Sequence, residues 1–141
     1  LAGQPGVRSF GDVFETYLDR NLLASQRLFE AAARAGVRVV FASTSTIYGE
    51  AERYPTPEDV VPRPVSPYGI TKLGCEHLAR AMTRSFALDV VVLRYFSVYG
   101  PRQRPDMAFT RVATCSTIIT TPATFWSVSG ERPSSRTGWS T

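Results

Sequence analysis

The stretch SPYGITKLGCEHLARAMTRSFALDVVVLRYF, residues 66–96, decides the fold that this sequence predicts. Ser66 is a favourable N-cap and Pro67 suits a first helical turn, so we expect a helix that begins here and continues to about Ala87. Residues 89–96 are a short run rich in valine, which is typical of a buried parallel strand. The stretch therefore predicts a helix followed directly by a strand.

The same order of elements occurs once more upstream. Residues 12–36, DVFETYLDRNLLASQRLFEAAARAG, predict a long helix that ends at Gly36, and residues 37–43, VRVVFAS, predict a second short strand. Alternating helices and strands build an α/β fold with a parallel sheet, and such sheets bind ligands beyond the carboxyl ends of their strands. The apolar positions near helical spacing are Phe14, Leu18, Leu22, Phe29 and Ala32.

Composition narrows the classes of function. The chain has 141 residues, the size of one domain or part of one, and its net charge of +4 comes from arginines scattered along its length. This pattern does not favour a nucleic-acid or membrane surface. Cys75, Cys115 and His77 lack metal-ligand spacing, and no run approaches the roughly 20 apolar residues of a membrane span. We expect a metal-free, cytoplasmic protein with reduced cysteines.

Polar segments that contain glycine follow both predicted strands. Residues 43–50 read STSTIYGE and residues 96–105 read FSVYGPRQRP. The proline-rich residues 51–65 connect the first of these segments to the second helix, and connections of this length often cover a site. Four hydroxyl side chains stand directly after the first strand, at the edge of the sheet where a ligand is expected: Ser43, Thr44, Ser45 and Thr46.

Lys72 is the only lysine of the chain, among fifteen arginines. It lies four residues after Tyr68, so the two side chains share one face of the predicted helix. A phenol has a pKa near 10 and accepts protons poorly at neutral pH unless a cation stabilises its charged form, and Lys72 is a suitable cation. The alternative is that Lys72 is a solvated surface residue, as most lysines are.

Together these motifs resemble the extended short-chain dehydrogenase/reductase family, the NAD-dependent epimerases and dehydratases of nucleotide sugars. The resemblance covers roughly residues 1–111 and rests on LAGQPGVR, FASTSTIYGE, PVSPYGITKLGCE and LRYFSVYGPRQRPDMAF. It implies a Rossmann-like parallel sheet flanked by helices. It also implies that the fold is incomplete here, with the first strand-helix-strand unit and the substrate lobe missing.

The resemblance implies a role for individual residues. Tyr68 would be the catalytic acid and base, and Lys72 would hold the nicotinamide ribose and lower the pKa of Tyr68. Thr44 would bond to the reacting sugar oxygen. Tyr68 would lie within hydrogen-bond reach of the same oxygen, because oxidation of a carbinol requires that the hydroxyl proton leave with the hydride. The residues expected to contact NAD are Leu1, Ala2, Gly3, Ser43, Tyr68, Lys72 and Phe96. The residues expected to contact the nucleotide sugar are Thr44, Ser45 and Ser97.

The chemistry can be narrowed within the family. Nucleotide-sugar dehydratases carry Asp-Glu after the catalytic hydroxyl residue, whereas this chain has Ser45-Thr46, which cannot act as carboxylic acids. This favours an epimerase similar to UDP-glucose 4-epimerase, which oxidises a sugar and reduces it again. A reductase or dehydratase of a related nucleotide sugar, or a truncated product without enzymatic activity, remains the alternative. Ser97 stands where many relatives carry Asn, so the sugar itself stays open.

Three expectations concern the organisation of the chain. Residues 1–111 are expected to be the central and C-terminal part of an NAD-binding domain that is inactive alone, since the glycine-rich turn that cradles pyrophosphate does not occur in the sequence. Residues 112–141 form an atypical tail rich in Ser and Thr, which suggests a frame shift or disorder. The helices of residues 17–35 and 68–86 are expected to pair across a twofold axis in a homodimer, as in relatives.

Overall fold

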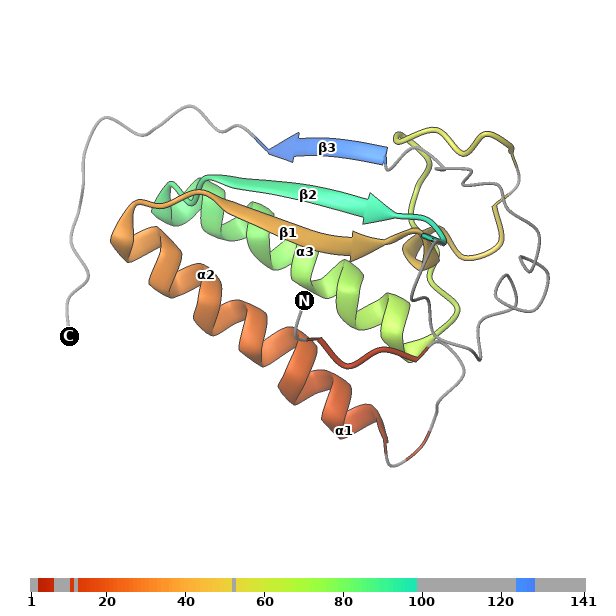
Figure 1. Ribbon diagram of the computed structural model, residues 1–141, viewed down its shortest axis with the longest axis horizontal. Helices are drawn as coiled ribbons and strands as arrows, with labels where there is room; N and C mark the ends of the chain where they lie inside the picture. Colours follow the sequence, from red (N-terminus) through yellow and green to blue (C-terminus); the bar gives the residue numbers. More distant parts are fainter. Residues whose placement is uncertain (1–2, 7–10, 12, 52, 99–123, 129–141) are drawn as a thin grey trace, which may run out of the picture.

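The computed structural model describes residues 3–6, 11, 13–51, 53–98 and 124–128 of the chain. Within these residues a three-stranded sheet has the order β1-β2-β3 (Figure 1). Strands β1 (Val39–Thr44) and β2 (Val90–Tyr95) are parallel, with Val39 opposite Val90 and Thr44 opposite Tyr95. Because the first residues of the two strands pair with each other and the last residues do too, both strands end at the same edge of the sheet. This confirms the predicted parallel arrangement.

One continuous helical segment precedes β1. It consists of α1 (Val13–Tyr17), the π-helical segment η1 (Leu18–Leu23) and α2 (Ala24–Ala35). Gly36 ends it in the left-handed conformation, with φ of 64°. The predicted long helix is therefore confirmed. Its π-helical turn has no recognisable sequence pattern and was not predicted, and such turns occur frequently at functional sites.

The helix α3 (Pro67–Phe86) connects β1 to β2 as predicted. The Ser66 side chain accepts a hydrogen bond of 3.1 Å from the Gly69 backbone N–H, so Ser66 is the N-cap. Ala87 ends the helix with a positive φ of 53°. The first turn of α3 begins near the carboxyl ends of β1 and β2, the edge at which parallel sheets generally bind ligands (Figure 1).

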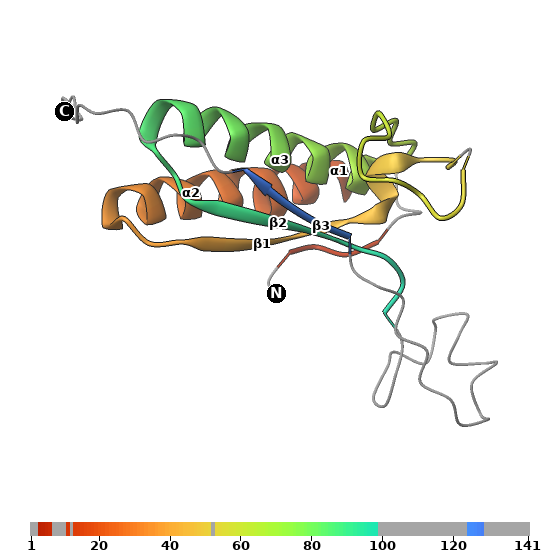
Figure 2. The same cartoon turned by 90° about the horizontal axis from the view of Figure 1, so that it is seen from above.

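The long helices lie on the same side of the sheet, as both views show (Figures 1 and 2). The core joins them to the strands. The rings of Phe29 and Phe41 meet edge to face, with centres 5.4 Å apart, and the other buried members are Ala32, Cys75, Ala79, Met82, Leu88, Val90 and Val92. The valine-rich strands predict burial on both faces. The described residues cover one face, and Val40 on the other is 63% exposed.

A third strand, β3 (Thr124–Val128), pairs antiparallel to β2. It lies in the tail, for which the sequence predicts no sustained periodicity. The strand was not predicted because five residues are too few to show a periodic pattern, although Thr, Phe, Trp and Val individually favour strands. The remainder of the tail lies outside the described residues, so frame shift and disorder stay untested predictions. In the described part of the chain, no helix combines the length and the apolar character needed to cross a membrane.

Gly49 is expected to be essential for the loop that follows β1. Its φ is +66°, and a Cβ atom there would lie 2.1 Å from the Arg63 carbonyl oxygen. Gly49→Ala should therefore lower the free energy of unfolding by about 2–4 kcal/mol, measured by chemical denaturation. Gly36→Ala is the matched control: φ is +64° there, but no atom lies within 4 Å, so only backbone strain of about 1 kcal/mol is expected. Equal losses in both variants would contradict the close approach to Arg63.

Candidate active site

Lys72 lies in the second turn of α3 and is only 9% exposed. Its ammonium donates a hydrogen bond of 2.9 Å to the Ala42 carbonyl oxygen of β1. It also lies 4.8 Å from the centre of the Phe41 ring and 6.0 Å from the centre of the Tyr68 ring. The alternative of a solvated surface lysine is therefore wrong, and the structure brings Lys72 and Tyr68 together as predicted.

The ionisation of this pair is set mainly by burial. Burial raises the pKa of Tyr68 above its ordinary value, with smaller contributions from Tyr17 and Cys75. Burial likewise lowers the pKa of Lys72, and Cys75 only partly offsets the effect. The expected lowering of the Tyr68 pKa by Lys72 stays a prediction. In the chain by itself, the Lys72 ammonium is directed to the Ala42 carbonyl and the Tyr68 side chain is half-buried.

Thr44 is the last residue of β1 and caps the short 3-10 helix η2 (Ser45–Tyr48). Its hydroxyl accepts a hydrogen bond of 3.2 Å from the Thr46 backbone N–H and lies 3.1 Å from the Thr46 hydroxyl. The turn packs closely on the start of α3, because a Cβ atom at Gly69 would lie 2.9 Å from the Thr46 carbonyl oxygen. The turn that carries Thr44, Ser45 and Thr46 therefore lies beside the helical turn that carries Tyr68.

Gly3 lies on the other side of Lys72. A Cβ atom at Gly3 would lie 3.7 Å from the Lys72 ammonium and 3.0 Å from the Asn21 Oδ1 atom. Because glycine has no side chain, Gly3 leaves the space beside the Lys72 ammonium open. Leu1 and Ala2, which were predicted with it, lie outside the described residues.

Asn21 and Tyr17 hold the segment that contains Gly3. The Asn21 side chain, in the π-helical turn and 2% exposed, accepts a hydrogen bond of 2.7 Å from the Gln4 N–H and donates one of 3.2 Å to the Gln4 carbonyl. The Tyr17 hydroxyl donates to the Gly6 carbonyl at 2.6 Å. Neither residue was predicted from the sequence. The available signal was a polar Asn21 three and four residues after the apolar Leu18 and Tyr17, on the same helix face.

Three other predicted residues lie further from the ammonium or are engaged elsewhere. Ser43 is buried and its hydroxyl donates to the Glu76 carboxylate, so its side chain is directed into the protein. Phe96 is half-buried and its ring stacks on that of Tyr48, with the centres 6.4 Å apart. Ser97 is exposed. Contacts of these residues with a cofactor or substrate stay predictions.

A buried ion pair lies behind the site and was also not predicted. Arg94 of β2 and Glu76 of α3 are 3% and 1% exposed, and Arg94 Nη2 lies 2.8 Å from Glu76 Oε2. Arg94 also donates to the Tyr48 hydroxyl at 2.8 Å and to the Glu58 carbonyl at 3.3 Å. Burial alone would lower the pKa of Arg94, but the hydrogen bonds and charges of Glu76 and Tyr48 raise it.

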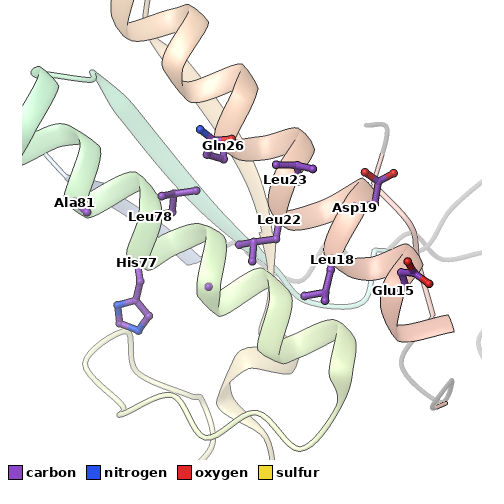
Figure 3. Close-up of a pocket in the computed structure, with 10 residues that line it drawn as sticks. Glu15, Leu18, Asp19, Leu22, Leu23, Gln26, His77, Leu78 and Ala81 are labelled. Atoms are coloured by element: carbon purple, nitrogen blue, oxygen red, sulfur yellow. The ribbon is translucent and has the colours of Figure 1, made fainter. Parts of the chain in front are cut away.

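An apolar groove of about 920 Å³ lies between the first helical segment and α3 (Figure 3). It is separate from the Tyr68–Lys72 site, since neither residue lines it. Acidic and other polar side chains border it, among them Glu15, Asp19, Gln26 and His77. Its apolar lining consists of Leu18, Leu22, Leu23, Gly74, Leu78 and Ala81.

Comparison with known proteins gives a consistent result. The model of the NAD dependent epimerase/dehydratase family matches residues 1–119. The uncharacterized UDP-glucose epimerase YtcB of Bacillus subtilis is 49% identical, with 79% of this chain and 36% of the relative covered. UDP-glucuronate 4-epimerase of Thermodesulfobacterium geofontis is 42% identical, with coverages of 79% and 35%. The chain thus spans about a third of the length of these relatives.

A solved structure shows the same similarity in three dimensions. UDP-glucuronic acid 4-epimerase from Bacillus cereus, in complex with UDP-glucuronic acid and NAD, superposes with a TM-score of 0.74. It is 48% identical, and the match covers 79% of this chain and 36% of that chain.

Proposed function

The chain belongs to the NAD-dependent epimerase/dehydratase family, and on this premise we propose that it carries the catalytic residues of a UDP-sugar 4-epimerase. The observation that supports the proposal most is the buried position of Lys72 beside Tyr68. The two residues lie at the edge of the sheet where β1 ends at Thr44 and η2 begins. Residues 1–111 are proposed to be the central and C-terminal part of the NAD-binding domain. A cytoplasmic location is proposed with it, because nucleotide sugars and NAD are soluble metabolites.

The residues around Lys72 fit the nicotinamide end of NAD. The Lys72 ammonium has three N–H donors, and the described contacts direct one of them to Ala42, so it can donate to the hydroxyls of a ribose. Gly3 supports the fit, because a side chain there would fill the space next to the ammonium. The proposed contacts of Ser43 and Phe96 would be made by their backbones, since the Ser43 hydroxyl is engaged with Glu76.

In the proposed mechanism, the main task of this chain's residues is to accept and return the carbinol proton of the sugar. When bound, NAD would supply a reversible hydride acceptor for the sugar carbinol carbon, and inversion would require that the oxidised sugar turn over in the site before it is reduced. Tyr68 accepts the carbinol proton as the sugar is oxidised and gives it back on reduction. Because burial raises the pKa of Tyr68, the proton acceptor needs a neighbouring cation, and Lys72 is the one that lies beside its ring. The Thr44 hydroxyl holds the reacting oxygen in place.

The turn after β1 favours epimerisation over dehydration. Elimination needs an acid for the leaving hydroxyl and a base for a carbon-bound proton, and Ser45 and Thr46 supply neither. In the described part of the site, the nearby Glu76 carboxylate is fully engaged with Arg94 and Ser43. Among UDP sugars, UDP-glucose and UDP-glucuronic acid are the first candidates, because the similar proteins are named for them. Ser45 and Ser97 are proposed to contact the sugar.

The proposed function can be tested in a hybrid enzyme. Residues 1–111 replace the matching segment of the Bacillus cereus 4-epimerase, whose remaining parts supply the rest of the NAD and substrate sites. We expect the hybrid to interconvert a UDP sugar and its C4 epimer. A soluble hybrid that binds NAD but leaves both UDP-glucose and UDP-glucuronic acid unchanged would contradict the proposal.

The apolar groove supports a second proposal, that the protein is a homodimer whose copies pack through these helices. Leu18 and Leu23 are each 40% exposed on its rim, and the groove runs along both α3 and the first helical segment. A second copy would bury these leucines across a twofold axis, since one self-complementary patch suffices for a dimer. The acidic Glu15 and Asp19 would stay at the polar border.

Leu18→Glu combined with Leu23→Glu should convert the dimer to a monomer, because two carboxylates would be buried unpaired in the interface. Light scattering at micromolar concentration measures the mass. Val61→Glu is the control, since Val61 is 68% exposed on the connecting loop and outside the groove. A wild-type chain that is monomeric in this measurement, or a dimer that survives both substitutions, would contradict the proposal.

A further inference from the structure

Glu76 continues the row of side chains that carries the proposed chemistry. Tyr68, Lys72 and Glu76 follow one another at intervals of four residues on α3, so they occupy one face of the helix. Unlike the other two, Glu76 has no proposed contact with substrate or cofactor. Its carboxylate is buried and bound by Arg94 through three hydrogen bonds of 2.8–3.3 Å.

The ion pair reaches both ends of the turn that carries the hydroxyl side chains. At the start of the turn, the Ser43 hydroxyl donates to Glu76, and Ser43 directly precedes Thr44. At its end, the Tyr48 hydroxyl accepts a hydrogen bond of 2.8 Å from Arg94 Nη1. The ring of Tyr48 also lies beneath the guanidinium, 5.1 Å from Arg94 Cζ. Residues 44–47 therefore lie between two residues that are tied to the Glu76 carboxylate, Ser43 directly and Tyr48 through Arg94. These two contacts are called the anchor of the turn.

Stability alone is a weak reason for this arrangement. A buried ion pair is costly to desolvate, and well-packed apolar residues in its place are often as stable or more stable. A planar guanidinium offers something that apolar residues lack: it donates in fixed directions to several acceptors at once. Here those acceptors belong to α3, to η2 and to the connecting loop at Glu58. The pair therefore fixes the orientation of three segments relative to one another.

We propose that Glu76 and Arg94 are positioning residues that hold the Thr44–Ile47 turn at a fixed distance from Tyr68. The inference rests on the proposed function, because it assigns to the turn the task of holding the reacting oxygen next to the Tyr68 phenol. Displacement of catalytic groups by about 1 Å can cost on the order of a hundredfold in rate. An anchored turn is required wherever both groups bind one oxygen atom.

Two substitutions loosen the anchor without leaving a buried charge unpaired. Arg94→Lys keeps the positive charge beside Glu76 but lacks the fork needed to reach Tyr48 as well. Tyr48→Phe removes one hydroxyl and keeps the ring that stacks on Phe96. The matched control is Arg38→Lys: Arg38, directly before β1, pairs with Asp89, directly before β2, at 2.8 Å on the surface, at the end of the strands away from the turn.

The first readout is amide hydrogen exchange in the 141-residue chain, which needs no activity. We expect residues 44–49 to exchange about tenfold faster in Arg94→Lys and Tyr48→Phe, with α2 and the middle of α3 unchanged. Exchange in Arg38→Lys should equal that of the wild type. Unchanged exchange of residues 44–49 in both anchor variants would overturn the proposal, whether or not the hybrid enzyme is active.

The second readout separates positioning from folding. In the hybrid enzyme, both anchor variants should lower kcat by about ten- to a hundredfold while KM for the UDP sugar changes less than about threefold, as expected for groups that act on the reacting geometry. Faster exchange of the turn with unchanged kcat would overturn the proposal. If the wild-type hybrid has no activity, the proposed function fails, and hydrogen exchange alone decides whether the ion pair anchors the turn.

Discussion

Tyr68→Phe is expected to lower kcat of the hybrid enzyme by about 10²–10⁴-fold, the usual contribution of a positioned proton acceptor. The substitution removes only the hydroxyl. The ring remains and keeps its contact with Tyr17, whose ring centre lies 6.3 Å away. Because the described residues give the Tyr68 hydroxyl no hydrogen bond within the chain, the free energy of unfolding should change by less than about 0.5 kcal/mol.

The control for this experiment is Tyr54→Phe. Tyr54 is 82% exposed in the connecting loop, so its hydroxyl has no expected role in the chemistry. Steady-state turnover of both variants, with NAD binding measured in parallel, gives the comparison. Turnover of Tyr68→Phe within about threefold of the control would remove Tyr68 from the proposed mechanism.

Lys72→Arg is the second substitution with a large expected effect, a loss of about a hundredfold in kcat. The positive charge is kept, but the guanidinium is larger and planar. Lys72 occupies a narrow space between the Phe41 ring, the Ala42 carbonyl and Gly3, so a guanidinium would displace the segment around Gly3 or the Tyr68 ring. Overpacking of this kind also costs about 1–3 kcal/mol of stability, measured by denaturation.

A second variant separates the loss of fit from the loss of stability. Lys72→Met keeps an unbranched apolar side chain against Phe41 and removes the charge, so the fold should be retained while turnover is lost as well. Near-normal turnover of Lys72→Arg would show that any cation suffices at this position. Near-normal turnover of Lys72→Met would show that the ammonium has no part in the reaction.

Local signals in the sequence were sufficient for the elements that carry the site. Ser66 and Pro67 predict the start of α3, Gly36 predicts the end of α2, and the valine runs predict β1 and β2. The spacing of Tyr68 and Lys72 then predicts that they share a helix face, because this depends only on helix geometry. These features involve residues close together in the chain, so the spacing of the residues in the sequence already determines which of them are neighbours in the structure.

Contacts between distant segments could not be predicted in the same way. Ser43 and Glu76 are 33 residues apart, Tyr48 and Arg94 are 46 apart, and Asn21 binds Gln4 over 17 residues. Each pair consists of ordinary polar residues, and which residues become partners depends on how distant segments pack in the folded protein. The direction of the Lys72 ammonium toward Ala42 belongs to the same class, because these two residues are 30 positions apart in the chain.

The central claim, reversible oxidation at one sugar carbon without elimination, is tested most directly by proton NMR of the hybrid enzyme turning over UDP-glucose or UDP-glucuronic acid in D₂O with NAD. We expect the C4 epimer to form while the protons on C4 and C5 are retained, because the hydride is returned within the site and no base abstracts the C5 proton. NADH should not accumulate. Deuterium at C5 with loss of a hydroxyl would instead show a dehydratase, and NADH formed in proportion to an oxidised product would show a dehydrogenase; either result would contradict the account.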